Sequence, residues 1–157
     1  MTNKNTGEQH PCSRKHCFQA STFRAGAFEQ ADLDRLLQTN ACPGCNLEYA
    51  DLTGANLYQA NLTRTLLNVA SLNEANLNRS ILNESSMFGV SLSGANLQEA
   101  SLQRAALSGT NMYYAKLEGA RMDGATMDGV NLYRAVLTGA TWTDGRRCAE
   151  GSIGECK

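Results

Sequence analysis

A period of five residues dominates the sequence and restricts what the chain can fold into. From Leu47 to Trp142 every fifth residue is large and apolar, which gives twenty consecutive repeats without a break. Two residues before each of these centres stands a small residue, and in thirteen of the twenty repeats it is Ala. A strand alternates every two residues and a helix every 3.6, so neither keeps an apolar stripe of period five on one face. The repeat therefore requires another geometry, in which each five-residue unit forms one side of a coil.

In this geometry the centre and the small residue two before it point inward, and the other three residues face water. If four units close one coil, successive coils stack at the parallel-strand spacing of roughly 4.8 Å. Residues 45–144 then make about five coils. The centres are interpreted as core, each contributing roughly 1.5–3 kcal/mol by burial. One expected inward column consists of Leu57, Leu77, Leu97, Leu117 and Leu137, with Ala55, Ala75, Ala95, Ala115 and Ala135 beside it.

The units ANLYQ, ANLTR, ANLNR and ANLQE resemble the A(D/N)LXX unit of the pentapeptide-repeat family, and the repeats cover about two thirds of the chain. The resemblance implies an all-β fold, a right-handed quadrilateral parallel β-helix. Periodicity alone sets neither the handedness nor the four sides. With its CPGC entry and cysteine-bearing tail, the chain is similar to bacterial and cyanobacterial members of the periplasm or thylakoid lumen.

The flanks of the repeats are expected to cap the stack, because exposed strand edges invite association. Leucines at helical spacing in ADLDRLLQT predict a short helix over about residues 30–39, which the turn-forming CPGC ends. The predicted division is an N-terminal segment at 1–29, a cap helix and turn at 30–44, the β-helix at 45–144 and a cap tail at 145–157.

The N-terminal segment allows two interpretations, a partly disordered stretch or an imperfect extra coil. The second rests on Phe18, Phe23, Phe28 and Leu33, which also run at period five. Fourteen residues separate Leu33 from Leu47, which breaks the register. Such a coil over residues 12–33 would therefore not continue directly into the main stack.

Six cysteines fall into three close pairs, Cys12 with Cys17, Cys42 with Cys45, and Cys148 with Cys156. Six cysteines allow 15 disulfide connectivities, and the sequence does not choose among them, although local pairing is the simplest. A bridge from Cys148 to Cys156 would hold a tail that has little core of its own. In the loop-entropy model it would stabilise the tail by about 2–3 kcal/mol.

The same cysteines could serve redox or metal chemistry. CPGC resembles a thioredoxin-type CxxC, but the strand–helix scaffold that would lower a thiol pKa is missing. Soft ligands for zinc are present at His10, Cys12, His16, Cys17, Cys42 and Cys45. HPCSRKHC lacks a second CxxC at a recognised finger spacing, so neither a metal nor a cofactor is expected.

Charge and hydropathy restrict the partners and the compartment. A formal charge of −1, from 14 basic and 15 acidic side chains, supplies no large field to attract nucleic acid or an anionic membrane. No run approaches the roughly 18 apolar residues of a membrane-spanning helix, so membrane insertion is not expected. Paired cysteines favour the periplasm or thylakoid lumen, whereas the polar start MTNKNTGEQH favours the cytoplasm if it is the natural start.

Folding the sequence into four faces gathers outward apolar residues on one of them. This face is centred on Leu47 and Leu67, and its outward positions include Tyr49, Leu66, Val69, Phe88 and Ala106. Apolar patches of this kind mark contact surfaces, although scattered apolar residues are ordinary on any surface. The next face gathers Tyr113, Tyr114 and Tyr133, a weaker candidate. On the fourth face Arg64, Glu84 and Arg104 are expected to form a ladder of alternating charge.

The sequence favours a non-enzymatic scaffold that presents rigid faces to an unidentified protein partner, or to a second copy in a homodimer. No Ser/His/Asp set, phosphate-binding glycine loop or close carboxylate pair can be assembled, and no concave pocket is expected in the prism. One alternative is the DNA mimicry of pentapeptide proteins that protect DNA gyrase from quinolones. Residues 45–144 hold nine acidic and six basic side chains, which suits that role poorly. A small redox or zinc-binding protein is the other alternative.

Overall fold

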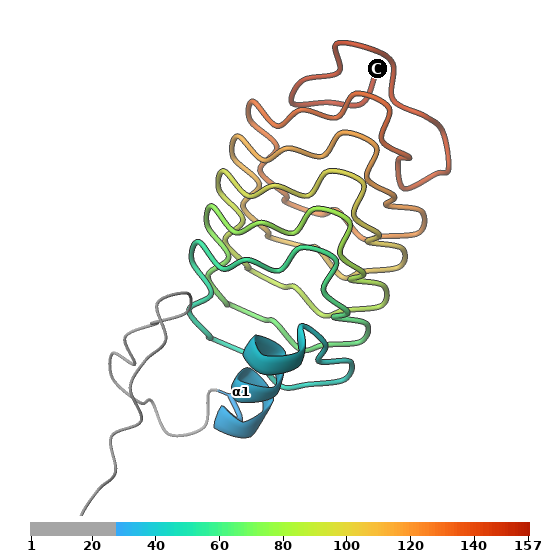
Figure 1. Ribbon diagram of the computed structural model, residues 1–157. Helices are drawn as coiled ribbons and strands as arrows, with labels where there is room; N and C mark the ends of the chain where they lie inside the picture. The colour runs from blue at the N-terminus through green and yellow to red at the C-terminus, as the bar shows by residue number, and fades with distance from the viewer. Residues whose placement is uncertain (1–27) are drawn as a thin grey trace, which may run out of the picture.

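The computed structural model describes residues 28–157, in which one helix precedes a long stack of coils (Figure 1). The helix, α1, spans Gln30–Thr39. In the stack, isolated parallel bridges join residues twenty apart, from Ala41 with Asn61 to Arg121 with Thr141. Each coil therefore has four sides of five residues. None of the helical structure within residues 28–157 has the length and apolarity needed to span a bilayer.

Backbone hydrogen bonds connect each coil to its neighbours. The N–H of Leu97 donates to the carbonyl of Lys116 in the next coil at 2.7 Å, and the N–H of Ala100 closes the corner onto the carbonyl of Leu97 at 3.0 Å. From Gly44 to Gly139 the residue two after each centre completes the corner with a positive φ, such as 59° at Arg79 and 68° at Gly94. Glycine adopts this left-handed conformation without steric cost, which explains its frequency at this position.

The interior contains the two residue columns that the five-residue period predicts. Leu97 and Ala95 are both fully buried, and so are their equivalents in the coils on either side. Where the small inward residue is polar, its hydroxyl finds a backbone partner: Ser80 Oγ donates to the Leu77 carbonyl at 2.7 Å, and Thr65 Oγ1 to the Cys42 carbonyl at 2.7 Å. The predicted inward pair is thus confirmed.

The first side of the stack begins earlier than the leucine pattern indicated. CPGC was expected only as a turn, but Ala41–Gly44 forms a regular side, because Cys42 stands five residues before Leu47. The N–H groups of Cys42 and Gly44 donate to the carbonyls of Asn61 and Thr63 at 2.8 and 2.9 Å. The leucine pattern does not predict this side, because cysteine is smaller than the other centres.

Helix α1 lies at the N-terminal end of the stack (Figure 1). It ends at Thr39 and is capped by Asn40, which has φ 56° and donates its N–H to the Leu36 carbonyl at 2.8 Å. Leu36 is buried, and Phe28 and Leu33 pack against the core. Since Leu33 belongs to the helix, it is not the centre of a coil. Phe18 and Phe23, two of the other positions proposed for an extra coil, lie outside the described residues.

The tail pairs with only half of the last coil. Antiparallel bridges join Val136 to Ile153 and Thr141 to Arg147. The sides centred on Met127 and Leu132 receive no such cover from the described residues, and both side chains are only partly buried, whereas the centres one coil earlier are fully buried. The C-terminal end is therefore half closed.

Candidate functional site

The apolar residues that the sequence assigns to one face are exposed. The exposed fraction is 53% for Tyr49, 41% for Leu66, 48% for Val69 and 61% for Phe88, and Ala106 is exposed as well. We call these five residues the apolar face. By register they lie on adjacent coils, since Asn46 bridges Leu66, Leu66 bridges Ser86, and Ser86 bridges Ala106.

Small residues make this side of the prism flat around the larger ones. The column that begins with Tyr49 and Val69 continues as Gly89, Gly109 and Gly129. A Cβ on Gly109 would lie 3.8 Å from Phe88 Cε2, so the Phe88 ring leans over this glycine. Among outward positions of this side, only Glu48 and Asp128 are charged. The surface is therefore apolar at its N-terminal half and carries no basic group.

Val69 has an unfavourable backbone conformation. Its φ of 59° lies in the left-handed region, where nine of the equivalent corner positions from Gly44 to Gly139 carry glycine. Val69 is the β-branched residue among them, and left-handed φ costs L-residues roughly 1–2 kcal/mol. An exposed side chain gains little from packing in return. The other ten non-glycine corners have the same positive φ, so the conformation belongs to the fold, and Val69 differs from them in its branched side chain.

A second exposed cluster lies on the adjacent side, toward the half-closed end. The Tyr113 ring stacks on Tyr133 at 5.7 Å between centroids and meets Tyr114 edge-on at 4.4 Å. Arg134 lies over the rings of Tyr114 and Tyr133 at 5.4 and 5.5 Å, a cation–π contact that the sequence reasoning missed. Desolvation, followed by the influence of Tyr114, raises the pKa of the Tyr113 hydroxyl above its ordinary value.

Two ion pairs among the described residues join side chains of neighbouring coils. Arg64 Nε lies 2.8 Å from Glu84 Oε2, and this hydrogen bond lowers the pKa of Glu84. The expected ladder is only partly formed, because Arg104 makes no ion pair within 4.0 Å among the described residues. A second pair, Arg79 with Glu99 at 2.9 Å, lies on the side before it. Pairs of opposite sign do not build a continuous acidic stripe.

Two disulfides occur within the described residues, Cys42–Cys45 and Cys148–Cys156. Both follow the local pairing; Cys12 and Cys17 lie outside the described residues. Cys148–Cys156 ties the tail at the half-closed end. Cys42 and Cys45 occupy a centre and the next small inward position, and both are fully buried. They span a corner that leucine and alanine fill elsewhere.

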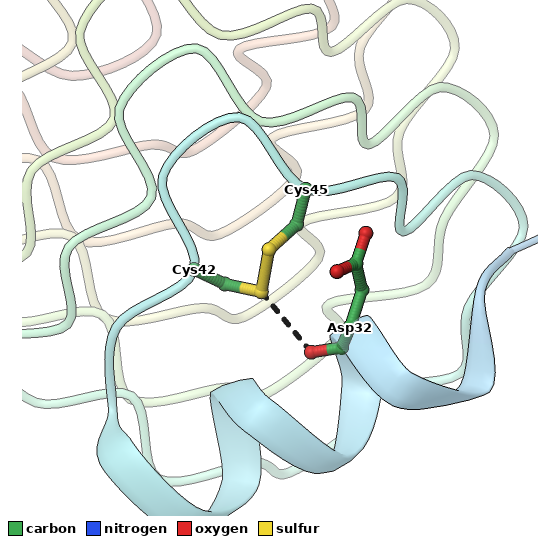
Figure 2. A group of neighbouring side chains, drawn as sticks. All are labelled: Asp32, Cys42 and Cys45. Atoms are coloured by element: carbon green, nitrogen blue, oxygen red, sulfur yellow. Dashed lines mark hydrogen bonds between the residues drawn. A yellow bond between two sulfur atoms is a disulfide. The ribbon is translucent and has the colours of Figure 1, made fainter.

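The Cys42–Cys45 disulfide faces the first turns of α1 (Figure 2). Cys42 Sγ lies 3.0 Å from the Asp32 carbonyl oxygen, and the Arg35 guanidinium contacts Cys45 Sγ. Arg35 also pairs with Asp32 Oδ1 at 3.2 Å, and Asp32 Oδ2 accepts the N–H of Asn46 at 2.8 Å. Sequence reasoning missed both partners, because only the packing of α1 brings them to CPGC.

The chemical capacity of these groups is limited. Asp32, Cys42 and Cys45 place their ligand atoms within 4.8 Å of one another, but the disulfide removes both thiolates that zinc would need. The remaining zinc candidates, His10, Cys12, His16 and Cys17, lie outside the described residues. A shallow hollow on the fourth face contains amides, charged side chains and a glycine but no nucleophile with an adjacent base. Its lining residues are Asn83, Glu84, Gln103, Arg104, Asp123 and Gly124.

Comparison with known proteins identifies the family. The model of pentapeptide repeats matches residues 45–87, 85–124 and 115–141, in eight copies. The chain therefore belongs to the pentapeptide-repeat proteins, and its fold is the right-handed quadrilateral β-helix of that family. A search of the curated proteins finds no match.

Solved structures agree with this assignment. A pentapeptide-repeat protein from the Arabidopsis thaliana thylakoid lumen is 24% identical, with a TM-score of 0.61 over 69% of this chain and 81% of its own. Rfr23 from the cyanobacterium Cyanothece is 30% identical, with a TM-score of 0.60 over 71% of this chain and 86% of its own. QnrB1, a plasmid-mediated fluoroquinolone resistance protein, is 21% identical over 57% of this chain and 58% of its own, and its TM-score of 0.31 supports no functional comparison.

Proposed function

We propose that the protein is a non-enzymatic scaffold that binds another protein through the apolar face. The proposal rests on the exposure of Leu66, Val69 and Phe88, which lie on adjacent coils of one side at outward positions that the core does not use. Clustered apolar surface on a soluble protein is typical of a contact site.

The chemistry of the face defines the partner. The side of the prism that carries it has two charged residues, Glu48, which accepts a hydrogen bond from Asn68 Nδ2 at 2.6 Å, and Asp128 near the other end. An apolar protein surface without acidic groups is therefore the complementary partner, and nucleic acid is not. The flat column of Gly89 and Gly109 allows the backbone of such a partner to approach closely.

We also infer that the two ends of the scaffold are caps on a stack of about five coils. Helix α1 supports this role at one end, with Leu36 buried against the first coil. The tail supports it at the other, where the N–H groups of Leu137 and Gly139 donate to the carbonyls of Ser152 and Cys148 at 2.8 and 3.0 Å. Caps of this kind would leave the faces as the surfaces available to a partner.

The test compares two double variants in a cross-linking pull-down from an extract of the source organism. Leu66→Ser with Phe88→Ser removes the centre of the apolar face. Tyr58→Ser with Ile81→Ser removes two exposed apolar residues from the other sides and serves as the matched control. We expect a defined protein to be captured by the natural protein and the control, and to be lost with the first variant, at unchanged melting temperature.

Two results would contradict the proposal. If both double variants capture the protein as well as the natural protein does, the apolar face is not the contact site. Unfolding of the Leu66→Ser, Phe88→Ser variant would show that these residues stabilise the chain itself. Size-exclusion chromatography with light scattering on the same samples separates loss of a partner from loss of self-association.

A further inference from the structure

We propose that Cys42 and Cys45 form a reversible thiol–disulfide couple that exchanges with a dithiol, and that α1 supplies the partners of the reduced form. The inference is independent of the apolar face. Its starting point is that the disulfide occupies a corner where the fold needs no cross-link, since leucine or methionine with a small residue fills the corners of the following coils.

The contact between Cys42 Sγ and the Asp32 carbonyl is the first observation. At 3.0 Å, two groups that only accept hydrogen bonds face each other while the sulfur is oxidised (Figure 2). Reduction adds a proton to Cys42, and the same geometry then becomes an S–H donor facing a carbonyl oxygen. The contact is thus better satisfied in the reduced state than in the oxidised state.

The second observation is the Arg35 guanidinium in contact with Cys45 Sγ. A neutral disulfide sulfur gains little from a cation, whereas a thiolate is stabilised by one and has a lowered pKa. Asp32 opposes this effect with its carboxylate, which lies within 4.8 Å of both sulfurs. Cys45 is therefore the thiolate of the reduced pair, and Arg35 and Asp32 set its stability with opposite signs.

These contacts define the direction of exchange. A thiolate of the reductant attacks Cys42 Sγ, and the electron pair of the S–S bond leaves with Cys45 as the thiolate beside Arg35. The second thiol of the reductant then displaces Cys42, which takes one proton, while the other proton released goes to solvent. The reductant loses two electrons and two protons and becomes a disulfide. A better-stabilised leaving thiolate makes the first step faster.

Access to the sulfurs requires α1 to move, because both cysteines are fully buried. The helix has ten residues, of which only Leu36 is fully buried, so it belongs to the part of the molecule that opens at low free-energy cost. Leu36 therefore controls how fast the pair reacts, whereas Arg35 and Asp32 control where its equilibrium lies. The two roles can be measured separately.

The experiment uses the full chain, with dithiothreitol as the reductant and mass-spectrometric trapping of free thiols at Cys42 and Cys45. We expect reduction while circular dichroism still reports the folded stack. Arg35→Met should shift the thiol–disulfide equilibrium about tenfold toward the disulfide, which is about 30 mV for this two-electron couple, and Arg35→Lys should restore most of it. Asp32→Asn should shift it in the opposite direction. Leu36→Ala should speed reduction several-fold beyond any change in the equilibrium.

Opposite shifts from Arg35→Met and Asp32→Asn are the diagnostic result, because loss of a merely structural contact would move both variants the same way. Reduction that occurs only as the stack melts would overturn the proposal, as would an equilibrium that is the same in Arg35→Met, in Asp32→Asn and in the natural protein. Cys148→Ser with Cys156→Ser is the control, since removal of the other disulfide should leave the behaviour of Cys42 and Cys45 unchanged.

Discussion

Leu97 is the residue at which the core can be tested most directly. Its side chain is fully buried in a middle coil, between the equivalent residues Leu77 and Leu117 of the same inward column. Leu97→Ala removes most of this side chain without touching the surface. The expected cost of a buried leucine-to-alanine change is about 2–5 kcal/mol, depending on how far the surroundings collapse into the cavity.

The structure places Leu97→Ala in the upper part of that range. Collapse would require the coils above and below to approach, but their spacing is fixed by backbone hydrogen bonds. The N–H of Leu77 donates to Asn96 and that of Leu97 to Lys116, both at 2.7 Å. We therefore expect a loss of about 3–5 kcal/mol, which corresponds to a fall in melting temperature of roughly 10 °C or more.

Thermal and urea unfolding followed by circular dichroism measure this loss, with Leu132→Ala as the matched control. Leu132 is a centre of the half-closed end and only partly buried, so its truncation leaves an open notch that water can fill. A cost of about 1–2 kcal/mol is expected there. If both variants lose the same stability, the coils are not held at fixed spacing and the reasoning fails.

Two further predictions concern single surface positions. Val69→Gly should relieve the left-handed strain and stabilise the fold by about 0.5–1 kcal/mol in urea unfolding, while it weakens capture of the partner. Gln59→Gly is the control, because Gln59 has φ 57° but an unbranched side chain, and it should gain less stability. A loss of stability in Val69→Gly would contradict the strain at Val69. Glu84→Lys should lower the melting temperature at low salt and leave it nearly unchanged at molar salt, because it replaces the partner of Arg64 by a like charge. Since Arg64 lowers the pKa of Glu84, the stabilisation by this pair is present above the ordinary carboxyl pKa and is lost as pH falls through the lowered pKa of Glu84. An effect of Glu84→Lys that depends on neither salt nor pH would exclude the ion pair.

The interior of the fold could be predicted from the sequence because each inward position repeats the same requirement. A centre such as Leu97 must be large and Ala95 small whatever the other residues are, so a period of five identifies the core without any knowledge of side-chain contacts. The same register placed Arg64 beside Glu84 correctly. The handedness and the number of sides could be predicted only from the resemblance to the family. The period of five does not determine them, because the same residues face inward whatever their values.

The ends could not be predicted in the same way, because they depend on contacts between segments that share no period. The side at Ala41–Gly44 was missed because cysteine does not match the leucine pattern. The approach of Arg35 to Cys45 depends on how α1 packs beneath the first coil, and no spacing along the sequence encodes that docking. The half-open sides of Met127 and Leu132 follow from the path of the tail, which is equally nonperiodic.

Asn46 connects the proposed redox pair to the proposed contact face. Its N–H donates to Asp32 Oδ2 at 2.8 Å, its carbonyl accepts the N–H of Glu29 at 3.3 Å, and it bridges Leu66 in the next coil. A movement of α1 on reduction would therefore reach the base of the apolar face through one residue. Because the hydrogen bonds between later coils do not involve α1, the effect should be confined to Tyr49 and Leu66 and should leave Phe88 in place. A partner that depends on Leu66 would then sense the redox state of Cys42 and Cys45, and one that depends on Phe88 alone would not.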